Sequence, residues 1–301
     1  MPFALDPRQS SFLHNLSRIQ ERSERAQRTL ASGLRMATAS DDPDRIGVLL
    51  QSRAELASAE QTKSNLNRVR TEVDAAEYAV QNGIKVVERV RVLAAQASSG
   101  TQSAATKRMI ASEVEALHRQ LVGIANTAID GRYIFAGSAD QAPPYTVDLN
   151  TATGATIYAG GNATRQIRDA SGVRFSIGRT GQELFDNPTA ASNAFRVVKS
   201  VRDALLANDD VALQSGLADL GTALDHLNEQ LGYYGTAQNS IAEAVSFADK
   251  KILSLTAEIA ETEGADLAQT ILEMQDANTH RQAALQAKAQ EDRRTVFDFI
   301  R

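Results

Sequence analysis

The sequence contains no cysteine and no tryptophan, and aromatic residues make up only 5% of it. Without cysteine, a disulfide framework and a thiolate metal site are both excluded. Large aromatic side chains usually fill wide globular cores, whereas alanine and aliphatic residues suit thin contacts between helices. The scarcity of aromatics therefore predicts an elongated molecule with a narrow helical core.

Proline is also scarce, with six residues in the chain and none between positions 44 and 142. A region without proline permits a long uninterrupted helix. No run of about 18 apolar residues occurs, so the sequence predicts no membrane insertion. The first residues lack the basic and apolar regions of a cleaved secretion signal. We therefore expect that any export of the protein uses a route that does not depend on such a signal.

Charge is unevenly distributed over a formal net charge of −5, which argues against a general nucleic-acid binder. Residues 1–35 hold six arginines and three carboxylates, while residues 241–301 hold eleven acidic and seven basic groups. Opposite signs favour association of the two ends. Two independently solvated helix faces explain the same distribution equally well.

Narrow apolar stripes mark both ends of the chain. Near the N-terminus, residues spaced alternately four and three apart are Phe12, Leu16, Ile19, Ser23, Ala26 and Leu30. Near the C-terminus, the same spacing is found at Ile241, Val245, Ala248, Ile252, Leu255 and Ile259, and it resumes at Leu267, Ile271 and Met274. Such a stripe must be buried against another helix. The chain is thus predicted to bundle its own ends, to bundle with copies of itself, or both.

We predict an assembly seam on the terminal helices, formed by Phe12, Leu16, Ile19, Ala26, Leu30, Leu267, Ile271, Met274 and Leu285. The first helix is expected to be capped by Ser10 or Ser11 and to end or bend at Gly33. A second helix is expected over about 43–98, with Asp42 as its cap and Pro43 in its first turn. A short break then requires an antiparallel third helix, which is expected to end near Asp130 and Gly131.

Composition changes over residues 131–182, which contain eight of the 18 glycines. Four short strands are predicted there, at 133–135, 145–147, 156–158 and 173–177. Helices are expected to resume after Pro188, with a break at 208–210 and a hinge at 232–235. The closing helix, from about 237 to 300, is expected to bend at Gly264.

These elements predict a mainly α fold, an elongated coiled-coil-like helical bundle formed by both termini with a small inserted β-rich distal domain. The expected domains are terminal helices at 1–40 with 262–301, a helical rod at 41–131 with 188–261, and the β-rich domain at 132–187.

Residues that support catalysis or cofactor binding are not evident in the sequence. The four histidines have no metal-ligand spacing and are interpreted as packing or surface residues. Asp41, Asp42 and Asp44 suit either a hard cation or a helix N-terminus, and Pro43 favours the helix. Nucleophile-elbow and phosphate-loop motifs are absent. We therefore predict no enzyme activity, no metal and no cofactor.

Several motifs resemble the flagellin family. The N-terminal signature is matched at 29–35 and 39–43, and the C-terminal signature at 265–268, 282–287 and 297–300. Two further stretches, 131–138 and 177–185, resemble the hook–filament junction branch of this family, as does the Asp-Asp-Pro sequence. The residues that carry this resemblance are Asp41, Asp42, Pro43, Tyr133, Phe135 and Gly137.

The resemblance implies a structural adaptor of the bacterial flagellum that is exported unfolded through the flagellar type III apparatus. It implies an extracellular ring of identical subunits between the filament protein flagellin and another hook-associated protein, and an export chaperone. It also implies terminal helices that gain their order on assembly.

Three other functions remain open from the sequence. The nearest is flagellin itself, the filament subunit, from which the Asp42-Pro43 and 133–138 motifs differ. A helical enzyme with a β-rich catalytic domain would need convergent polar groups in a concave site, which the sequence does not offer. A generic coiled-coil scaffold does not account for the glycine-rich insertion.

Overall fold

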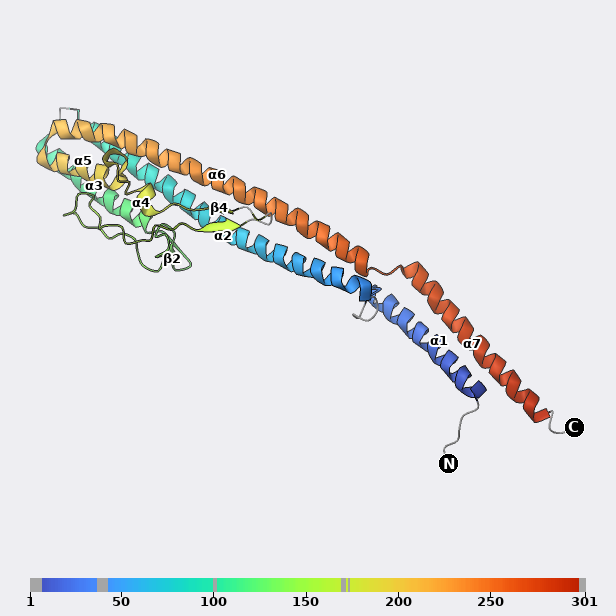
Figure 1. The fold of residues 1–301 in the computed structure, drawn as a ribbon. Coiled ribbons are helices and arrows are strands. Elements are labelled where there is room, and N and C mark those ends of the chain that lie inside the picture. Colours follow the sequence, from blue (N-terminus) through green and yellow to red (C-terminus); the bar gives the residue numbers. More distant parts are fainter. Residues whose placement is uncertain (1–6, 37–42, 100–101, 169–171, 173, 298–301) are drawn as a thin grey trace. The chain divides into compact units, whose positions relative to one another are not determined.

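The structure is a computed structural model that describes residues 7–36, 43–99, 102–168, 172 and 174–297. Its elements are α1 (Pro7–Ser32), α2 (Pro43–Ala97), α3 (Ala104–Ala125), β1 (Ala128–Ile129), β2 (Arg132–Tyr133), β3 (Gln166–Arg168), β4 (Arg174–Ser176), α4 (Gly181–Leu184), the 3-10 helix η1 (Ala190–Ser192), α5 (Ala194–Ala207), α6 (Asp210–Glu263) and α7 (Leu267–Phe297) (Figure 1). The prediction of a mainly α fold with a small strand-containing region is confirmed.

The chain divides into two compact units. The terminal unit comprises residues 1–58 and 251–301, and the central unit comprises residues 59–250. The long helices α2 and α6 contribute residues to both units. None of the helices in the described ranges carries an apolar stretch sufficient to span a bilayer.

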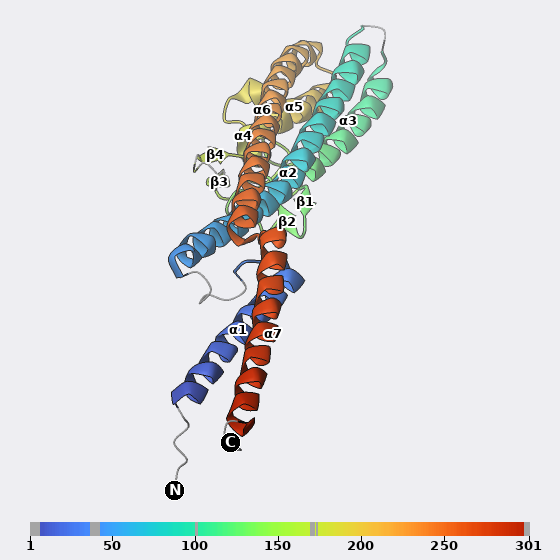
Figure 2. The ribbon, with the colours of Figure 1, turned by 90° about the vertical axis from the view of Figure 1, so that its right-hand side faces the viewer.

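The core of the central unit is built from the predicted heptad stripes. The core consists of aliphatic side chains from α2, α3, α5 and α6 that are at most 1% exposed. They include Val73, Val80, Val87, Val114, Leu121, Val201, Leu220, Leu227 and Ile241. α2 and α3 run side by side in opposite directions (Figure 2), and Arg89 pairs with Glu113 across them at 2.6 Å. Side chains of this size let helix backbones approach closely, so a thin core is sufficient for long helices.

The prediction for the end of α3 is wrong. α3 ends at Ala125, and Ala128 and Ile129 pair with Tyr133 and Arg132 in an antiparallel hairpin. Asp130 and Gly131 have φ values of 49° and 78° and form the two-residue turn. An Asp-Gly pair suits a helix end and a type I′ hairpin turn alike, and local sequence does not distinguish the two.

The strand-containing region is less regular than predicted. β4 falls within the predicted strand 173–177, although Val173 itself lies outside the described residues. β2 only touches the predicted strand 133–135, and the two middle strands are reduced to a bridge between Val147 and Ala155. β3 was not predicted, because Ile167 is its single apolar residue.

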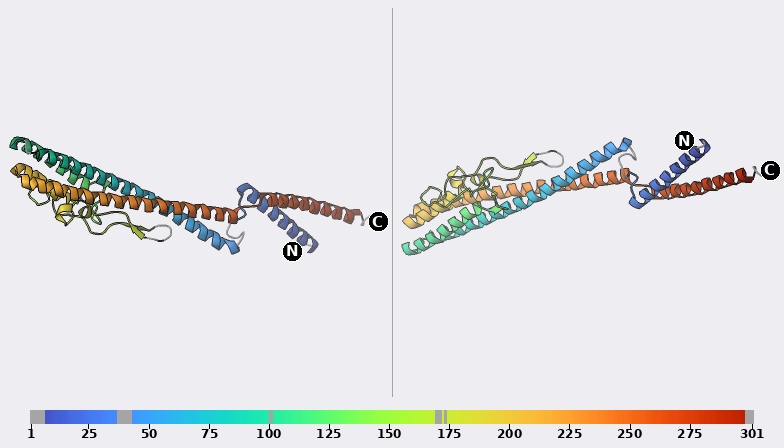
Figure 3. Two further views of the ribbon diagram at one scale, coloured as in Figure 1. Left: turned by 90° about the horizontal axis from the view of Figure 1, so that it is seen from above. Right: turned by 90° about the horizontal axis from the view of Figure 1, so that it is seen from below.

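The rare aromatic residues gather where this region meets the helices. Phe135, Tyr145, Phe185 and Phe195 are at most 1% exposed. The ring centroids of Tyr145 and Phe195 are 5.0 Å apart, and those of Phe135 and Phe185 are 5.6 Å apart. The loops and strands thereby lie on one side of the helices of the central unit (Figures 1 and 3). Burial of these rings attaches a region that has little sheet of its own.

Polar contacts fix the position of the same region. Asn126 donates from its side-chain amide to the Tyr145 carbonyl at 2.7 Å and accepts the Tyr145 backbone N–H at 3.1 Å. The buried His118 ring lies with its Nε2 2.9 Å from the Thr153 carbonyl oxygen. A Cβ added at Gly154 would lie 2.6 Å from this ring, so the loop approaches His118 as closely as it does only because residue 154 is glycine.

The predicted hinge at 232–235 is wrong, since α6 is continuous from Asp210 to Glu263. The Tyr234 hydroxyl accepts the Arg179 backbone N–H at 3.3 Å, and the Tyr233 hydroxyl donates to the Ser176 carbonyl at 3.0 Å. Both tyrosines tie α6 to the strand-containing region. The bend expected at Gly264 is a complete break between α6 and α7.

Stability of the central unit should fall in mild acid because of His118. Burial, followed in smaller part by the positive charges of Arg202 and Lys199, lowers the pKa of His118 below its ordinary value. The unfolded chain then binds the proton more readily than the folded chain, so the free energy of unfolding decreases as pH drops below about 6.5. Thermal unfolding between pH 7.5 and 5 measures this loss.

The matched controls for this prediction are His118→Gln and His280→Gln. The Tm of His118→Gln should fall less with pH than that of the unmodified chain, whereas His280→Gln, which changes an exposed side chain, should follow the unmodified chain. An identical decline in all three proteins would contradict the role of His118.

Candidate assembly site

The terminal unit contains the helix pair that the sequence predicts to be an assembly site. α1 and α7 pack against each other. On α1, the predicted stripe is the covered face: Ser23 and Ala26 are 7% and 3% exposed, and Phe12, Leu16, Ile19 and Leu30 are half-buried. The expected cap at Ser10 or Ser11 is wrong, because α1 begins at Pro7, a position where proline loses no helical hydrogen bond.

The face of α7 that packs against α1 is not the face that carries the predicted residues Leu267, Ile271 and Leu285. The residues covered on α7 are Thr270 and Ala277, at 7% and 1% exposure, with Met274 half-buried between them. Leu267, Ile271 and Leu285 are 47%, 39% and 49% exposed. At about 100° per residue, these three side chains share a face adjacent to the covered one. The terminal unit therefore carries an uncovered apolar stripe along α7.

The breaks that end α1 and α6 pair with each other through their backbones. Leu34 forms an antiparallel bridge with Gly264. The Arg35 N–H donates to the Glu263 carbonyl at 2.7 Å, and the Ala265 N–H donates to the Gly33 carbonyl at 3.0 Å. Gly33 has a φ of 70°, a conformation that glycine adopts without the cost borne by other residues. The sequence indicated each break but not that the two would pair.

Side chains reinforce this paired break. Arg53 forms an ion pair with Glu263, whose side chain is only 8% exposed. Arg35 donates from Nη2 to the Thr262 carbonyl at 3.2 Å. Because removing a partner from a buried carboxylate is costly, Arg53 fixes where α2 meets the end of α6.

A second pair of contacts lies along the same part of α2 and α6. Ser52 donates to Glu258 at 3.0 Å, and Lys251 pairs with Glu55 at 3.4 Å. The hydrogen bond from Gln51, followed by the hydrogen bond and the charge of Lys251, lowers the pKa of Glu55. These contacts hold the two helix ends of the terminal unit in register.

The residues that carry the family resemblance divide between the two units. Asp41 and Asp42 lie outside the described residues, and Pro43 is the first residue of α2 as predicted. Tyr133 lies in β2, Phe135 is fully buried, and Gly137 has a φ of 60°. A Cβ at Gly137 would lie 1.9 Å from the Gly161 carbonyl oxygen. Phe135 and Gly137 therefore shape the strand-containing region rather than present a reactive group.

Across the described ranges, no three or more His, Asp or Glu side chains are grouped as a metal site would require. The arrangement of the terminal unit offers covered and uncovered apolar faces and paired backbone breaks. Such surfaces are suited to association between chains.

The sequence matches the bacterial flagellin N-terminal helical region over residues 8–140 and the bacterial flagellin C-terminal helical region over residues 217–300. The chain belongs to the flagellin family. It is accordingly a structural protein of the bacterial flagellum and not an enzyme, as the absence of catalytic motifs in the sequence predicted.

Two relatives in this family differ in how much of each chain they match. Flagellin of Bacillus subtilis is 26% identical over 309 residues, covering 96% of this chain and 96% of the relative. Flagellar hook-associated protein 3 of Escherichia coli is 29% identical over 198 residues, covering 64% of this chain and 58% of the relative.

Solved structures share the fold at lower identity. A putative flagellar hook-associated protein from Vibrio parahaemolyticus matches with a TM-score of 0.67 and 14% identity, over 74% of this chain and all of that one. Hook-associated protein 3 from Legionella pneumophila matches with a TM-score of 0.62 and 16% identity, over 72% of this chain and 98% of that one. At these identities the likeness establishes the fold of this flagellin-family chain.

Substituting Gly264 by alanine should destabilise the paired break. The new Cβ would lie 2.5 Å from the Ala260 carbonyl oxygen, a backbone atom that cannot move aside. We expect a loss of about 1–3 kcal/mol in the free energy of unfolding of the terminal unit, as in other overpacked sites. Denaturant unfolding monitored by circular dichroism measures it.

The matched control is Gly232→Ala within α6, where no atom lies within 4 Å of the added Cβ. Alanine in a helix interior stabilises by about 0.5–1 kcal/mol relative to glycine. Equal stabilisation by both substitutions would mean that the close approach at residue 264 is unimportant.

Proposed function

We propose that this chain is a hook–filament junction protein: an adaptor that joins the flagellar hook, through another hook-associated protein, to the flagellin filament. The observation that carries the proposal is the 29% identity to hook-associated protein 3 of Escherichia coli over 64% of the chain. The 131–138 stretch, with Phe135 and Gly137 at the attachment of the strand-containing region, adds to it.

The chain is further proposed to form a ring of identical subunits. The uncovered face of α7, with Leu267, Ile271 and Leu285, supports this step, because exposed apolar residues on a helix gain stability when another subunit covers them. The predicted domains at 1–40 with 262–301, 41–131 with 188–261, and 132–187 belong to the same proposal. In it, the terminal helices reach full burial only in the assembly.

Partners and location follow from this role. The proposed partners are copies of the chain, flagellin, a second hook-associated protein, the type III export apparatus and an export chaperone. The proposed location is extracellular, at the boundary of hook and filament. Nucleic acid and membrane lipid have no part in the proposal.

A second candidate is the filament subunit itself. It is favoured by the likeness to flagellin of Bacillus subtilis over 96% of both chains. The two candidates differ in where the protein is found and in whether the purified chain polymerises.

Immunogold labelling of isolated flagella tests the junction role. The label should be confined to the hook–filament boundary, and the purified chain should not grow into long filaments under conditions that polymerise flagellin. Label distributed along the filament, together with polymerisation, would assign the chain as flagellin instead.

Charges introduced into the seam should abolish incorporation into flagella. Leu285→Asp places a carboxylate on the uncovered stripe of α7, where a covering subunit would bury it unpaired. Leu16→Asp places one on the half-buried face of α1, where burial of an unpaired charge is also costly. We expect the amount of the chain in sheared flagella to fall at least tenfold, while hydrogen exchange shows that the region 44–260 stays folded.

Gln286→Asp is the matched control, since it adds the same charge to the exposed neighbour of Leu285. It should incorporate normally. Normal incorporation of both Leu16→Asp and Leu285→Asp would refute the seam.

A further inference from the structure

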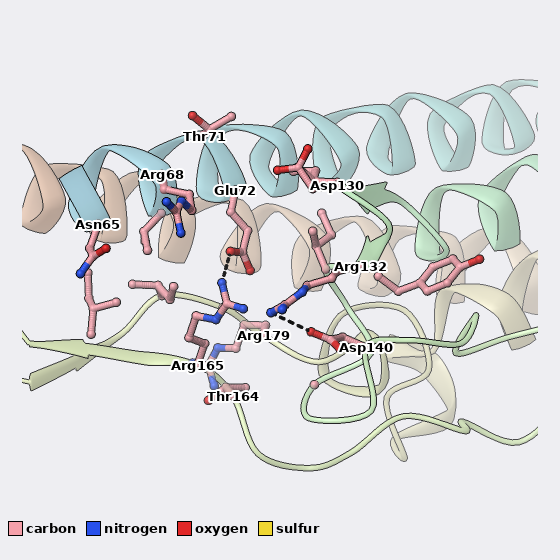
Figure 4. Close-up of a pocket in the computed structure, with 18 residues that line it drawn as sticks. Asn65, Arg68, Thr71, Glu72, Asp130, Arg132, Asp140, Thr164, Arg165 and Arg179 are labelled. Carbon is pink, nitrogen blue, oxygen red and sulfur yellow. Dashed lines mark hydrogen bonds and ion pairs between the residues drawn. The ribbon is translucent and has the colours of Figure 1, made fainter. Parts of the chain in front are cut away.

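The central unit contains a pocket with a volume of about 910 Å³ beside α2 and the two hairpins (Figure 4). Four arginines from separate segments line it. Arg68 comes from α2, Arg132 from β2, Arg165 from the residues before β3, and Arg179 from the residues before α4. No function derived above uses this group.

The arginines are incompletely neutralised. Arg165 pairs with Glu72 at 2.5 Å, whereas the ion pair between Arg132 and Asp140 is longer, at 3.7 Å, and beyond hydrogen-bond distance. Within the described part of the chain, Arg68 has no carboxylate partner. The Asp130 carboxylate, the third acidic group of the lining, is directed away from the guanidinium groups of Arg132 and Arg165 (Figure 4).

Contacts with Tyr233 and Glu183 fix the position of Arg179 at the edge of this pocket. Its guanidinium carbon lies 4.4 Å from the centre of the Tyr233 ring, and its Nη1 donates to Glu183 at 3.3 Å. Its Nε is buried without a hydrogen-bond partner among the described residues.

The neighbouring hairpin adds further positive charge. β3 and β4 place Arg168 directly opposite Arg174. Like charges in a cross-strand pair destabilise a hairpin. An anionic partner bound nearby would reduce the repulsion between Arg168 and Arg174. It would also reduce the repulsion among the four arginines of the pocket.

Aliphatic side chains complete the lining and limit the class of ligand. They are Val69, Ile129, Ile134, Ile167 and Ile177. A bare inorganic anion makes no use of these residues, and the pocket is far larger than one anion needs. A peptide that presents carboxylates together with aliphatic side chains matches both the charge and the apolar surface.

We propose that this pocket binds an acidic, partly aliphatic segment of a neighbouring flagellar subunit. The inference rests on the proposed role of the chain within a flagellar assembly. Guanidinium groups of Arg68 and Arg132 would receive the carboxylates, and the partly exposed Ile129 and Ile167 would contact the aliphatic side chains.

Site-specific photo-cross-linking in intact flagella tests the proposal. A photoreactive amino acid replaces Asn65, which lines the pocket on α2, in the full chain, and the control position is Arg70, which lies on the same helix and outside the lining. We expect position 65 to give at least threefold more adduct with another subunit than position 70, at a peptide that contains Asp or Glu.

Two variants link the adduct to the arginines. Arg68→Gln should lower the yield at position 65 at least threefold, and Arg70→Gln should leave it unchanged. Arg68 is exposed, so the first variant should keep the melting temperature of the unmodified chain. Adduct at peptides without acidic residues, yields equal to those at position 70, or no effect of Arg68→Gln would each overturn the proposal.

A third measurement separates the alternatives. Inorganic phosphate titrated onto the purified chain tests whether the pocket is an ion site. Saturable binding that Arg68→Gln abolishes, without an adduct in flagella, would replace the peptide assignment. If the adduct persists while immunogold places the chain along the filament, the junction role fails and the pocket assignment stands.

Discussion

Burial of narrow stripes of small apolar residues is the constraint on which the structure depends. Val73, Val80 and Val87 on α2 lie at most 1% exposed because other helices of the central unit cover this face of α2. A stripe of valine and alanine gives little apolar area per residue, so stability must be accumulated over many turns. This explains why α2 and α6 extend over 55 and 54 residues.

The strand-containing region is attached by a different kind of interaction. Its own strands are two or three residues long and supply little pairing. Phe135 and Tyr145 instead insert large rings against Phe185 and Phe195, and Asn126 satisfies the backbone of Tyr145. The region is thus positioned by the helices, and its two hairpins bring Arg132 and Arg165 to the pocket.

In the terminal unit the backbone is held by defined hydrogen bonds, but several apolar side chains remain exposed. Leu34 pairs with Gly264 through the backbone, and Arg53 neutralises the nearly buried Glu263, so the helix break is held by several contacts. By contrast, the leucines of the α7 stripe remain about half exposed. In this flagellin-family chain, hydrogen bonds hold the break between the helices, while one face of α7 stays uncovered. Another subunit can therefore pack on α7 without disrupting the fold of the terminal unit.

Local periodicity in the sequence by itself determined the long helices and the covered face of α1, because heptad spacing acts within one segment. The predicted end of α3 failed because Asp130-Gly131 is locally compatible with two structures. Only the tertiary structure decided which face of α7 meets α1 and which arginines line one pocket, since both depend on residues that lie far apart in sequence. The apolar spacing that includes Ile271 is the same whichever face of α7 packs against α1. In the structure the small residues Thr270 and Ala277 face α1 and let the two helices approach closely, and Ile271 is left 39% exposed. Such geometry is set by the volume of side chains on the partner helix, which no local pattern encodes.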